Sequence, residues 1–99
     1  MSDASPLAVL RLDLDRIDDR LVHLLNERVE KVHEIGRLKA RLGLALYDPD
    51  REKSILERLA RKNQGPLDAG AIARLFERII DESRRLEREE MRRAERNDA

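Results

Sequence analysis

Apolar residues recur at steps of three and four from Leu7 to Leu42, the spacing expected for one face of an α-helix. No proline interrupts this run, and Gly43 stands where the carboxy-terminal cap of a helix belongs. The pattern therefore predicts a single helix of roughly 50 Å, at about 1.5 Å per residue. The residues of the stripe are Leu10, Leu14, Ile17, Leu21, Leu24, Val32, Ile35 and Leu42.

A turn at residues 43–47 leads to a shorter second helix. Asp48-Pro49 predicts its start, because aspartate is a favoured cap and proline is tolerated at the first helical position. The apolar face of this helix is short and fades by Asn63. That face consists of Ile55, Leu56 and Leu59.

Gln64-Gly65-Pro66 interrupts the chain, and Asp68 can cap a third helix of medium length. From Arg88 onward the sequence is mostly charged, so we expect a solvated, fraying end at residues 88–99. The predicted fold is all-α, with three helices (long, short, medium) in one domain whose core spans about residues 7–87. The apolar side of the third helix carries Ile72, Leu75, Phe76, Ile79, Ile80 and Leu86.

The predicted long helix has a consequence for assembly. A compact domain of 99 residues has a radius of gyration of about 13 Å, too small to enclose such a helix. Two shorter helices cannot cover its whole apolar stripe. A second copy of the chain can, so the pattern favours a homodimer with paired long helices.

Composition narrows the classes of function. Basic and acidic residues balance, 21 against 21, and Tyr47 and Phe76 are the only aromatic residues, so neither a strong field nor a stacking platform favours nucleic acid. No apolar stretch is long enough to span a membrane. Residues 1–6 lack the pattern of a secretory leader, and the chain has no cysteine. We expect a cytoplasmic protein.

Two cations interrupt the apolar face of the long helix. Continuing the spacing from Leu24 places Arg28 and Lys39 on the same face as Val32 and Ile35. Residues eleven apart return to within about 20° of one direction, with backbones roughly 16 Å apart along the axis. Such side chains, leaning together, would leave a gap for a small dianion, although either alone could extend with its charge in water.

The third helix repeats this interruption. Ser83 and Glu87 continue the side that carries Ile72, Phe76 and Ile80, and they lie one turn apart. A serine inside a helix often bonds only its own backbone, and a glutamate at the end of an apolar stripe usually reaches solvent. Together with the two cations of the long helix, however, these side chains could converge on one pocket.

The start of the second helix adds Asp48, Arg51 and Glu52. Capping is sufficient to explain Asp48, the helix dipole favours Glu52 in the first turn, and Arg51 can be a surface residue. These explanations do not exclude a function for the three.

Other chemistries lack the residues they need. His23 and His33 are ten residues apart without a paired ligand at helical spacing, so we expect surface or dimer-edge histidines and no metal site. The chain has no glycine-rich phosphate loop, and Ser83 has no histidine near it in the sequence to form a nucleophilic triad. No cofactor is expected.

Over roughly residues 7–87, the sequence resembles the all-helical class of chorismate mutase. The order and spacing of the matching segments are specific, and they include the residues that interrupt the apolar stripes. In chain order the segments are Leu10-Arg11, Ile17-Asp18, LLNER at 24–28, IGRLK at 35–39, DPDRE at 48–52, GPL at 65–67 and LFERIIDES at 75–83.

The resemblance implies an intertwined homodimer with two equivalent active sites, each built from both chains. In the family pattern, Arg11 reaches in from the partner chain and Arg28 comes from the long helix; both would hold substrate carboxylates, with Ser83 assisting. Lys39 would contact a carboxylate and the ether oxygen.

The remaining polar residues would bind the other end of the substrate. Glu52 would accept a hydrogen bond from the ring hydroxyl, with Asp48 nearby and Arg51 at the same mouth. The implied reaction is the Claisen rearrangement of chorismate to prephenate, in the shikimate pathway of aromatic amino-acid biosynthesis. It needs no nucleophile, metal or cofactor.

One position departs from a common form of the family pattern. Many members carry glutamine where this chain has Glu87, although others carry glutamate. Because an ionised carboxylate would repel the ether oxygen, we expect Glu87 to be neutral when it acts. Arg28, Lys39 and Glu87 are the expected catalytic residues.

Two alternatives remain. An isochorismate-pyruvate lyase of the same fold uses a similar cationic pocket, although Asp48, Arg51 and Glu52 favour the mutase. A non-catalytic helical dimerisation module would explain the long stripe and the charged exterior, but it has no need for Arg28 and Lys39 on an apolar face.

Overall fold

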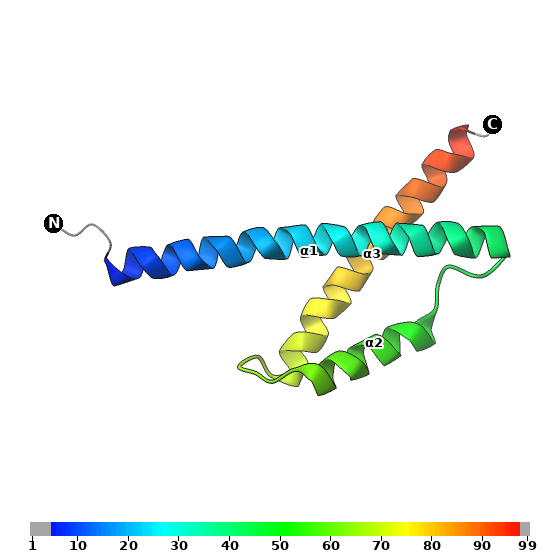
Figure 1. Ribbon diagram of the computed structural model, residues 1–99. Helices are drawn as coiled ribbons and strands as arrows, with labels where there is room; N and C mark the ends of the chain where they lie inside the picture. The colour runs from blue at the N-terminus through cyan, green and yellow to red at the C-terminus, as the bar shows by residue number, and fades with distance from the viewer. Residues whose placement is uncertain (1–4, 98–99) are drawn as a thin grey trace.

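The computed structural model describes residues 5–97, which form three α-helices and no strand. They are α1 (Pro6–Leu42), α2 (Pro49–Lys62) and α3 (Ala69–Asn97), as Figure 1 shows. The predicted all-α architecture and the order long, short, medium are confirmed. The amino-terminal residues 1–4, part of the segment that we judged not to be a leader, lie outside the described residues, as do 98–99.

α2 and α3 begin, and α1 ends, where the local sequence predicts. The backbone N–H of Arg51 donates to Asp48 Oδ1 at 3.0 Å, and that of Ala71 donates to Asp68 Oδ1 at 2.7 Å. Both aspartates therefore satisfy donors that a helix start leaves free. At the end of α1, Gly43 takes the left-handed conformation, with φ of 70°, which glycine adopts without steric cost.

α3 remains helical to Asn97, beyond Arg88, where the charge pattern predicts that the ordered core ends. One reason that this end stays helical is that its charged side chains pair with one another along α3 and with side chains of α1. Arg85 bonds Glu89 within α3 at 2.9 Å, and Glu90 bonds Arg37 of α1 at 2.7 Å. Such pairs support the end of the helix, which has few apolar side chains of its own.

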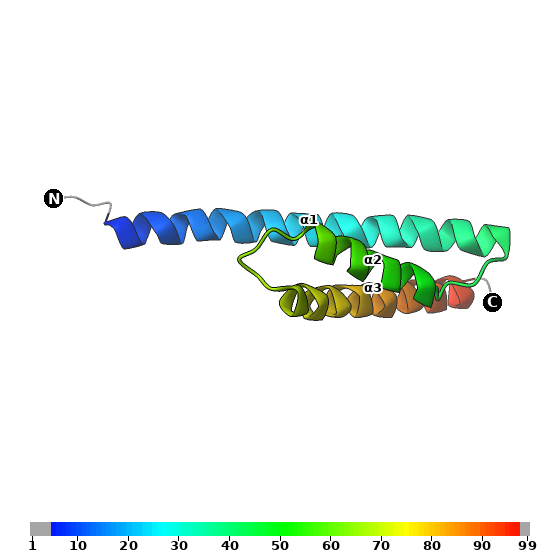
Figure 2. The same ribbon diagram turned by 90° about the horizontal axis from the view of Figure 1, so that it is seen from below.

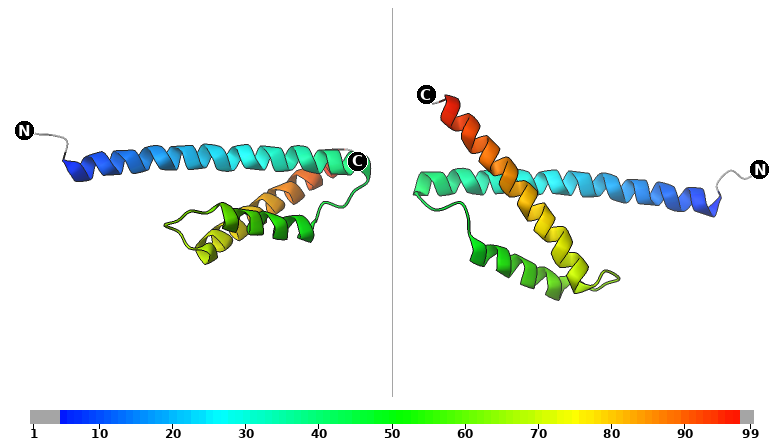
Figure 3. Two further views of the ribbon diagram at one scale, coloured as in Figure 1. Left: turned by 60° about the horizontal axis from the view of Figure 1, so that its bottom comes forward. Right: turned by 180° about the vertical axis from the view of Figure 1, so that it is seen from behind.

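α3 packs against both other helices. It crosses α1 within the carboxy-terminal half of α1. The amino-terminal half of α1 projects away from α2 and α3 in every view (Figures 1, 2 and 3). The chain is accordingly elongated, 65 × 33 × 16 Å, with a radius of gyration of 18.4 Å. A compact domain of this length would have about 13 Å.

In the single chain, residues 5–97 contain no fully buried apolar side chain, and Gly36 and Ser83 are the only residues classed as buried. Large apolar side chains along α1 stay exposed, including Leu10 at 65%. The apolar stripe predicted for α1 is thus present, but α2 and α3 leave most of it exposed. None of the described helices is both long and apolar enough to cross a membrane. The exposed members of the stripe in the projecting half are Leu10, Leu14, Ile17, Leu21 and Leu24.

Gly36 lies against α3 and is buried. A Cβ atom placed on this residue would lie 2.5 Å from Oε2 of Glu87, closer than real side-chain contacts allow. Glycine at this position therefore lets the Glu87 carboxyl group lie against the backbone of α1.

Gly36→Ala tests this approach. Alanine is favoured over glycine inside a helix by about 1 kcal/mol, but here the added methyl group would displace the Glu87 carboxyl group. In a Glu87→Ala background the methyl group meets no carboxyl, so we expect the substitution to stabilise the protein there by about 1 kcal/mol, and by less in the wild-type chain. Denaturant unfolding of the four proteins measures the difference. An equal gain in both backgrounds would show that the contact is absent.

Candidate active site

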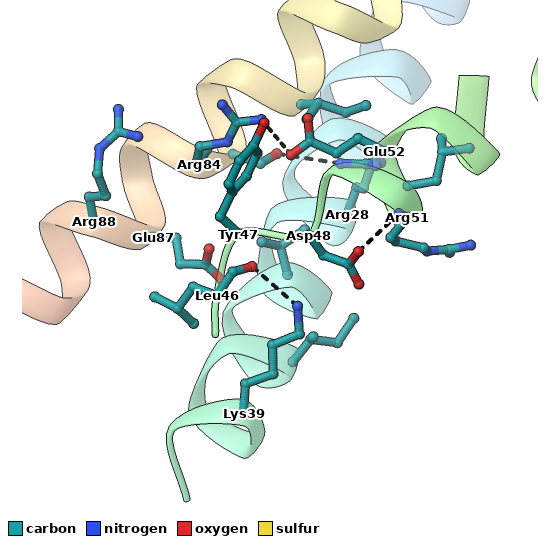
Figure 4. A pocket seen from close by; sticks show the side chains of 15 residues that line it. Arg28, Lys39, Leu46, Tyr47, Asp48, Arg51, Glu52, Arg84, Glu87 and Arg88 are labelled. Carbon is teal, nitrogen blue, oxygen red and sulfur yellow. Dashed lines mark hydrogen bonds and ion pairs between the residues drawn. The ribbon is translucent and has the colours of Figure 1, made fainter. Parts of the chain in front are cut away.

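A hollow of about 420 Å³ lies between the three helices and the loop that joins α1 to α2. Figure 4 shows the charged side chains that reach it from different segments. Apolar side chains form the rest of the wall, so the charged groups lie beside apolar surface. The lining residues are Arg28, Val32, Ile35, Lys39, Leu46, Tyr47, Asp48, Arg51, Glu52, Ile55, Ile80, Ser83, Arg84, Glu87 and Arg88.

The two cations that interrupt the stripe of α1 both line this hollow. Arg28 Nη1 donates to Ser83 Oγ at 3.5 Å, while the Ser83 hydroxyl donates to the carbonyl oxygen of Ile79 at 3.0 Å. Lys39 Nζ donates to the carbonyl oxygen of Leu46 at 3.2 Å (Figure 4). α1 and α3 therefore bring Arg28, Lys39 and Ser83 together across one cavity.

The positive charge at this site has little compensation. Burial lowers the pKa of Arg28, and the neighbouring Arg51 lowers it further. Within residues 5–97, no carboxylate forms an ion pair with Arg28, Lys39 or Arg51. An arginine remains protonated under such conditions, so the effect of burial is to leave a cation that an anionic ligand would stabilise.

The first turn of α2 supplies the acidic side of the hollow. Asp48 caps the helix through the N–H of Arg51, and Glu52 forms an ion pair with Arg84 of α3. The carboxyl group of Glu52 is partly shielded, with 28% of its side chain exposed. Asp48, Arg51 and Glu52 therefore share one edge of the cavity, as their spacing in the sequence allows.

Glu87 lines the hollow from α3. Burial is the largest effect on its carboxyl group and raises its pKa, and Glu90 acts in the same direction. Lys39, His33 and Arg84 oppose the shift without reversing it. The neutral form of Glu87 is thus favoured to a higher pH than in a free glutamate.

Arg11 does not line the hollow of its own chain. It precedes Arg28 by 17 residues on the same helix, which corresponds to about 25 Å along the axis. An arginine side chain cannot span that distance. Any role for Arg11 in such a hollow requires a second chain.

The structure adds lining residues that sequence reasoning missed, among them Leu46, Tyr47, Arg84 and Arg88. Arg84 follows Ser83 and precedes Arg88 by one turn, so both arginines flank the interrupted stripe of α3. This spacing was the available signal for the two arginines. For Tyr47 the sequence offered only its place beside the Asp48 cap.

Each of the two histidines lies close to a glutamate side chain. His33 Nδ1 is 3.3 Å from Glu90, and His23 is 3.7 Å from Glu27 on the same helix. The described part of the chain contains no group of histidine, cysteine and carboxylate side chains that could hold a metal ion.

Curated relatives match most of this chain over part of their own length. The bifunctional chorismate mutase/prephenate dehydratase of Neisseria gonorrhoeae is 43% identical over 75 residues, which are 76% of this chain and 20% of that protein. The bifunctional enzyme of the same name from Pseudomonas aeruginosa is 36% identical over 92 residues, 88% of this chain and 25% of that protein. The chain thus spans about a quarter or less of these relatives.

A solved structure matches the whole fold. Form II of chorismate mutase from Thermus thermophilus superposes with a TM-score of 0.82 and 40% sequence identity, over 85% of this chain and 96% of that one. The family model described as chorismate mutase type II matches residues 10–88, which include every predicted site residue. The chain therefore belongs to the chorismate mutase type II family, a family of isomerases.

Proposed function

We propose that this chain catalyses the rearrangement of chorismate to prephenate. In this reaction one molecule breaks its ether C–O bond and forms a C–C bond, without an acceptor, reductant or covalent intermediate. The observation that carries the proposal is the pair of cations, Arg28 and Lys39, which line one hollow and form no ion pair with a carboxylate of residues 5–97. The proposal places the reaction in aromatic amino-acid biosynthesis in the cytoplasm.

The two cations suit the two charged regions of the substrate. Arg28, supported by Ser83, would hold a carboxylate, and Lys39 would contact a carboxylate and the ether oxygen. Negative charge grows on that oxygen as the C–O bond breaks, so a fixed ammonium group stabilises the transition state more than the substrate. Holding the substrate in the chair conformation from which it reacts also removes part of the entropic barrier to the reaction.

The first turn of α2 would bind the ring. Glu52 would accept a hydrogen bond from the ring hydroxyl, with Asp48 beside it and Arg51 at the mouth. Glu87 would donate a hydrogen bond to the ether oxygen when it is protonated, which agrees with the raised pKa of its carboxyl group.

A second copy of the chain would complete each site. The stripe on the projecting half of α1 is exposed in the single chain, and Arg11 lies on that half. Pairing of two α1 helices would cover the stripe and carry Arg11 of the partner subunit to a substrate carboxylate. The proposed assembly is a homodimer with two shared sites.

The direct experiment follows the disappearance of chorismate and the appearance of prephenate with purified protein. A parallel assay with isochorismate, read by release of pyruvate, tests the lyase alternative. Turnover of chorismate well above that of isochorismate supports the proposal. No turnover of either substrate would favour a non-catalytic dimerisation module.

Arg28→Ala and Lys39→Ala should each lower kcat/KM by about 100-fold or more, because each removes a preorganised charge from the transition state. Both residues line the hollow and neither belongs to the exposed stripe on the projecting half of α1, so we expect the oligomeric state by size-exclusion chromatography to stay unchanged. Arg78→Ala is the matched control, since that side chain is 78% exposed on α3 and does not line the hollow. Full activity in both pocket variants would refute the proposed roles.

Mixing two inactive variants tests the shared site. Arg11→Ala and Arg28→Ala homodimers should each be inactive, whereas a mixed dimer contains one site with both arginines intact. With random exchange, half of the dimers are mixed and one of their two sites is complete, so about a quarter of wild-type activity should return. The measurement is chorismate turnover after the two variants are unfolded and refolded together. No recovery would contradict a site shared between chains.

The protonation of Glu87 predicts a pH profile. Turnover should fall as pH rises through the raised pKa of Glu87, because the carboxylate formed would repel the ether oxygen. Glu87→Gln keeps a donor that does not ionise, so its kcat should be flat over the same range. A mutant profile identical to that of the wild-type protein would remove Glu87 from the ether contact.

A further inference from the structure

Arg84 contacts three different segments of the chain at the edge of the hollow. Its guanidinium group pairs with Glu52 of α2, lies over the ring of Tyr47 at 4.9 Å from the centroid, and is 3.9 Å from Asp81 of α3. Figure 4 shows Arg84, Tyr47 and Glu52 grouped on one side of the cavity. Nothing in the function proposed above uses Arg84.

The position of α2 makes the contacts of Arg84 important for the hollow. α2 packs on α3 and not on α1, so its first turn is held over the hollow from the α3 side. The hydrogen bond with Glu52 is the main cause of the raised pKa of Arg84, with the charges of Glu52 and Asp81 adding to it. The cation of Arg84 is therefore compensated, unlike that of Arg28, and it is less suited to anchor a substrate carboxylate.

We propose that Arg84 is a positioning residue that fixes the Glu52 carboxylate for the substrate's ring hydroxyl. Arg84 bonds Oε2 of Glu52, which leaves Oε1 as the acceptor for one hydroxyl donor. Only about three-tenths of either side chain is exposed, so solvent screens the pair less than a surface ion pair. This role rests on the proposed function.

An arginine is suited to this double contact. Its planar guanidinium group can lie over the face of an aromatic ring while its edge donates to a carboxylate. Tyr47 thus limits the orientation of Arg84, and Arg84 limits that of Glu52. A site that hydrogen-bonds a substrate hydroxyl discriminates strongly against molecules lacking it, so the arrangement favours hydroxyl-bearing dicarboxylates.

A first measurement needs no turnover. The chain has one tyrosine and no tryptophan, so the near-ultraviolet circular dichroism of tyrosine reports on Tyr47 alone. Arg84→Gln should reduce this signal toward that of the unfolded chain, because the ring loses the group that orders it. Arg85→Gln is the matched control, since within the described part of the chain Arg85 bonds only Glu82 and Glu89 of its own helix. An unchanged signal in Arg84→Gln overturns the proposal.

A second measurement separates positioning from direct binding. We expect Arg84→Gln to raise KM for chorismate about 10-fold, the loss of one well-placed hydrogen bond, with a smaller change in kcat. In a Glu52→Gln background the same substitution should change KM little, because the residue it positions is gone. An equal rise in both backgrounds would show that Arg84 binds substrate itself and would overturn the proposal.

The two measurements keep the two proposals apart. If the wild-type chain does not turn over chorismate, the proposed function fails, and the tyrosine signal still decides whether Arg84 orders this edge of the hollow. If the wild-type chain is active and the tyrosine signal of Arg84→Gln is unchanged, only the role of Arg84 fails.

Discussion

The constraint on which this structure depends is the partial burial of the Arg28 guanidinium group, which lies beside Arg51 and forms no ion pair with a carboxylate of residues 5–97. Removing such a charge from solvent is costly, and Arg51 adds to the cost at Arg28. The long, unbroken α1 keeps Arg28 in place, and the buried Ser83 of α3 offers it a single neutral acceptor. Stability alone would favour an apolar residue at this position. The arrangement suits the proposed function, in which a carboxylate of the substrate would bind Arg28.

α3 organises the rest of the molecule around that charge. It packs on both other helices and lines the hollow with Ser83, Arg84, Glu87 and Arg88. Gly36 lets the Glu87 carboxyl group of α3 lie against α1, in the space that a side chain at position 36 would take. The same contact shields Glu87 from water, which raises the pKa of its carboxyl group. The packing of α3 against α1 therefore also favours the protonated form of Glu87.

Much of the fold could be predicted from the sequence, because its signals are local. Proline and aspartate mark the start of α2, Gly43 ends α1, and apolar spacing identifies all three helices. The length of α3 was less predictable, since its charged end is supported partly by Glu90, which pairs with side chains of α1. Residues that interrupt an apolar stripe led to much of the candidate site. The contacts of Arg84 with Glu52 and Tyr47 could not be predicted this way, because they join segments distant in the sequence.

The projecting half of α1 also bears on how the chain reaches its folded state. Without a closed apolar core, the isolated chain gains little from folding alone, and its stripe on α1 contributes fully only when another surface covers it. In the proposed homodimer, folding and association would be coupled steps of one equilibrium. The midpoint of thermal unfolding should then rise with protein concentration, and dilution should weaken the fold itself rather than merely separate finished subunits.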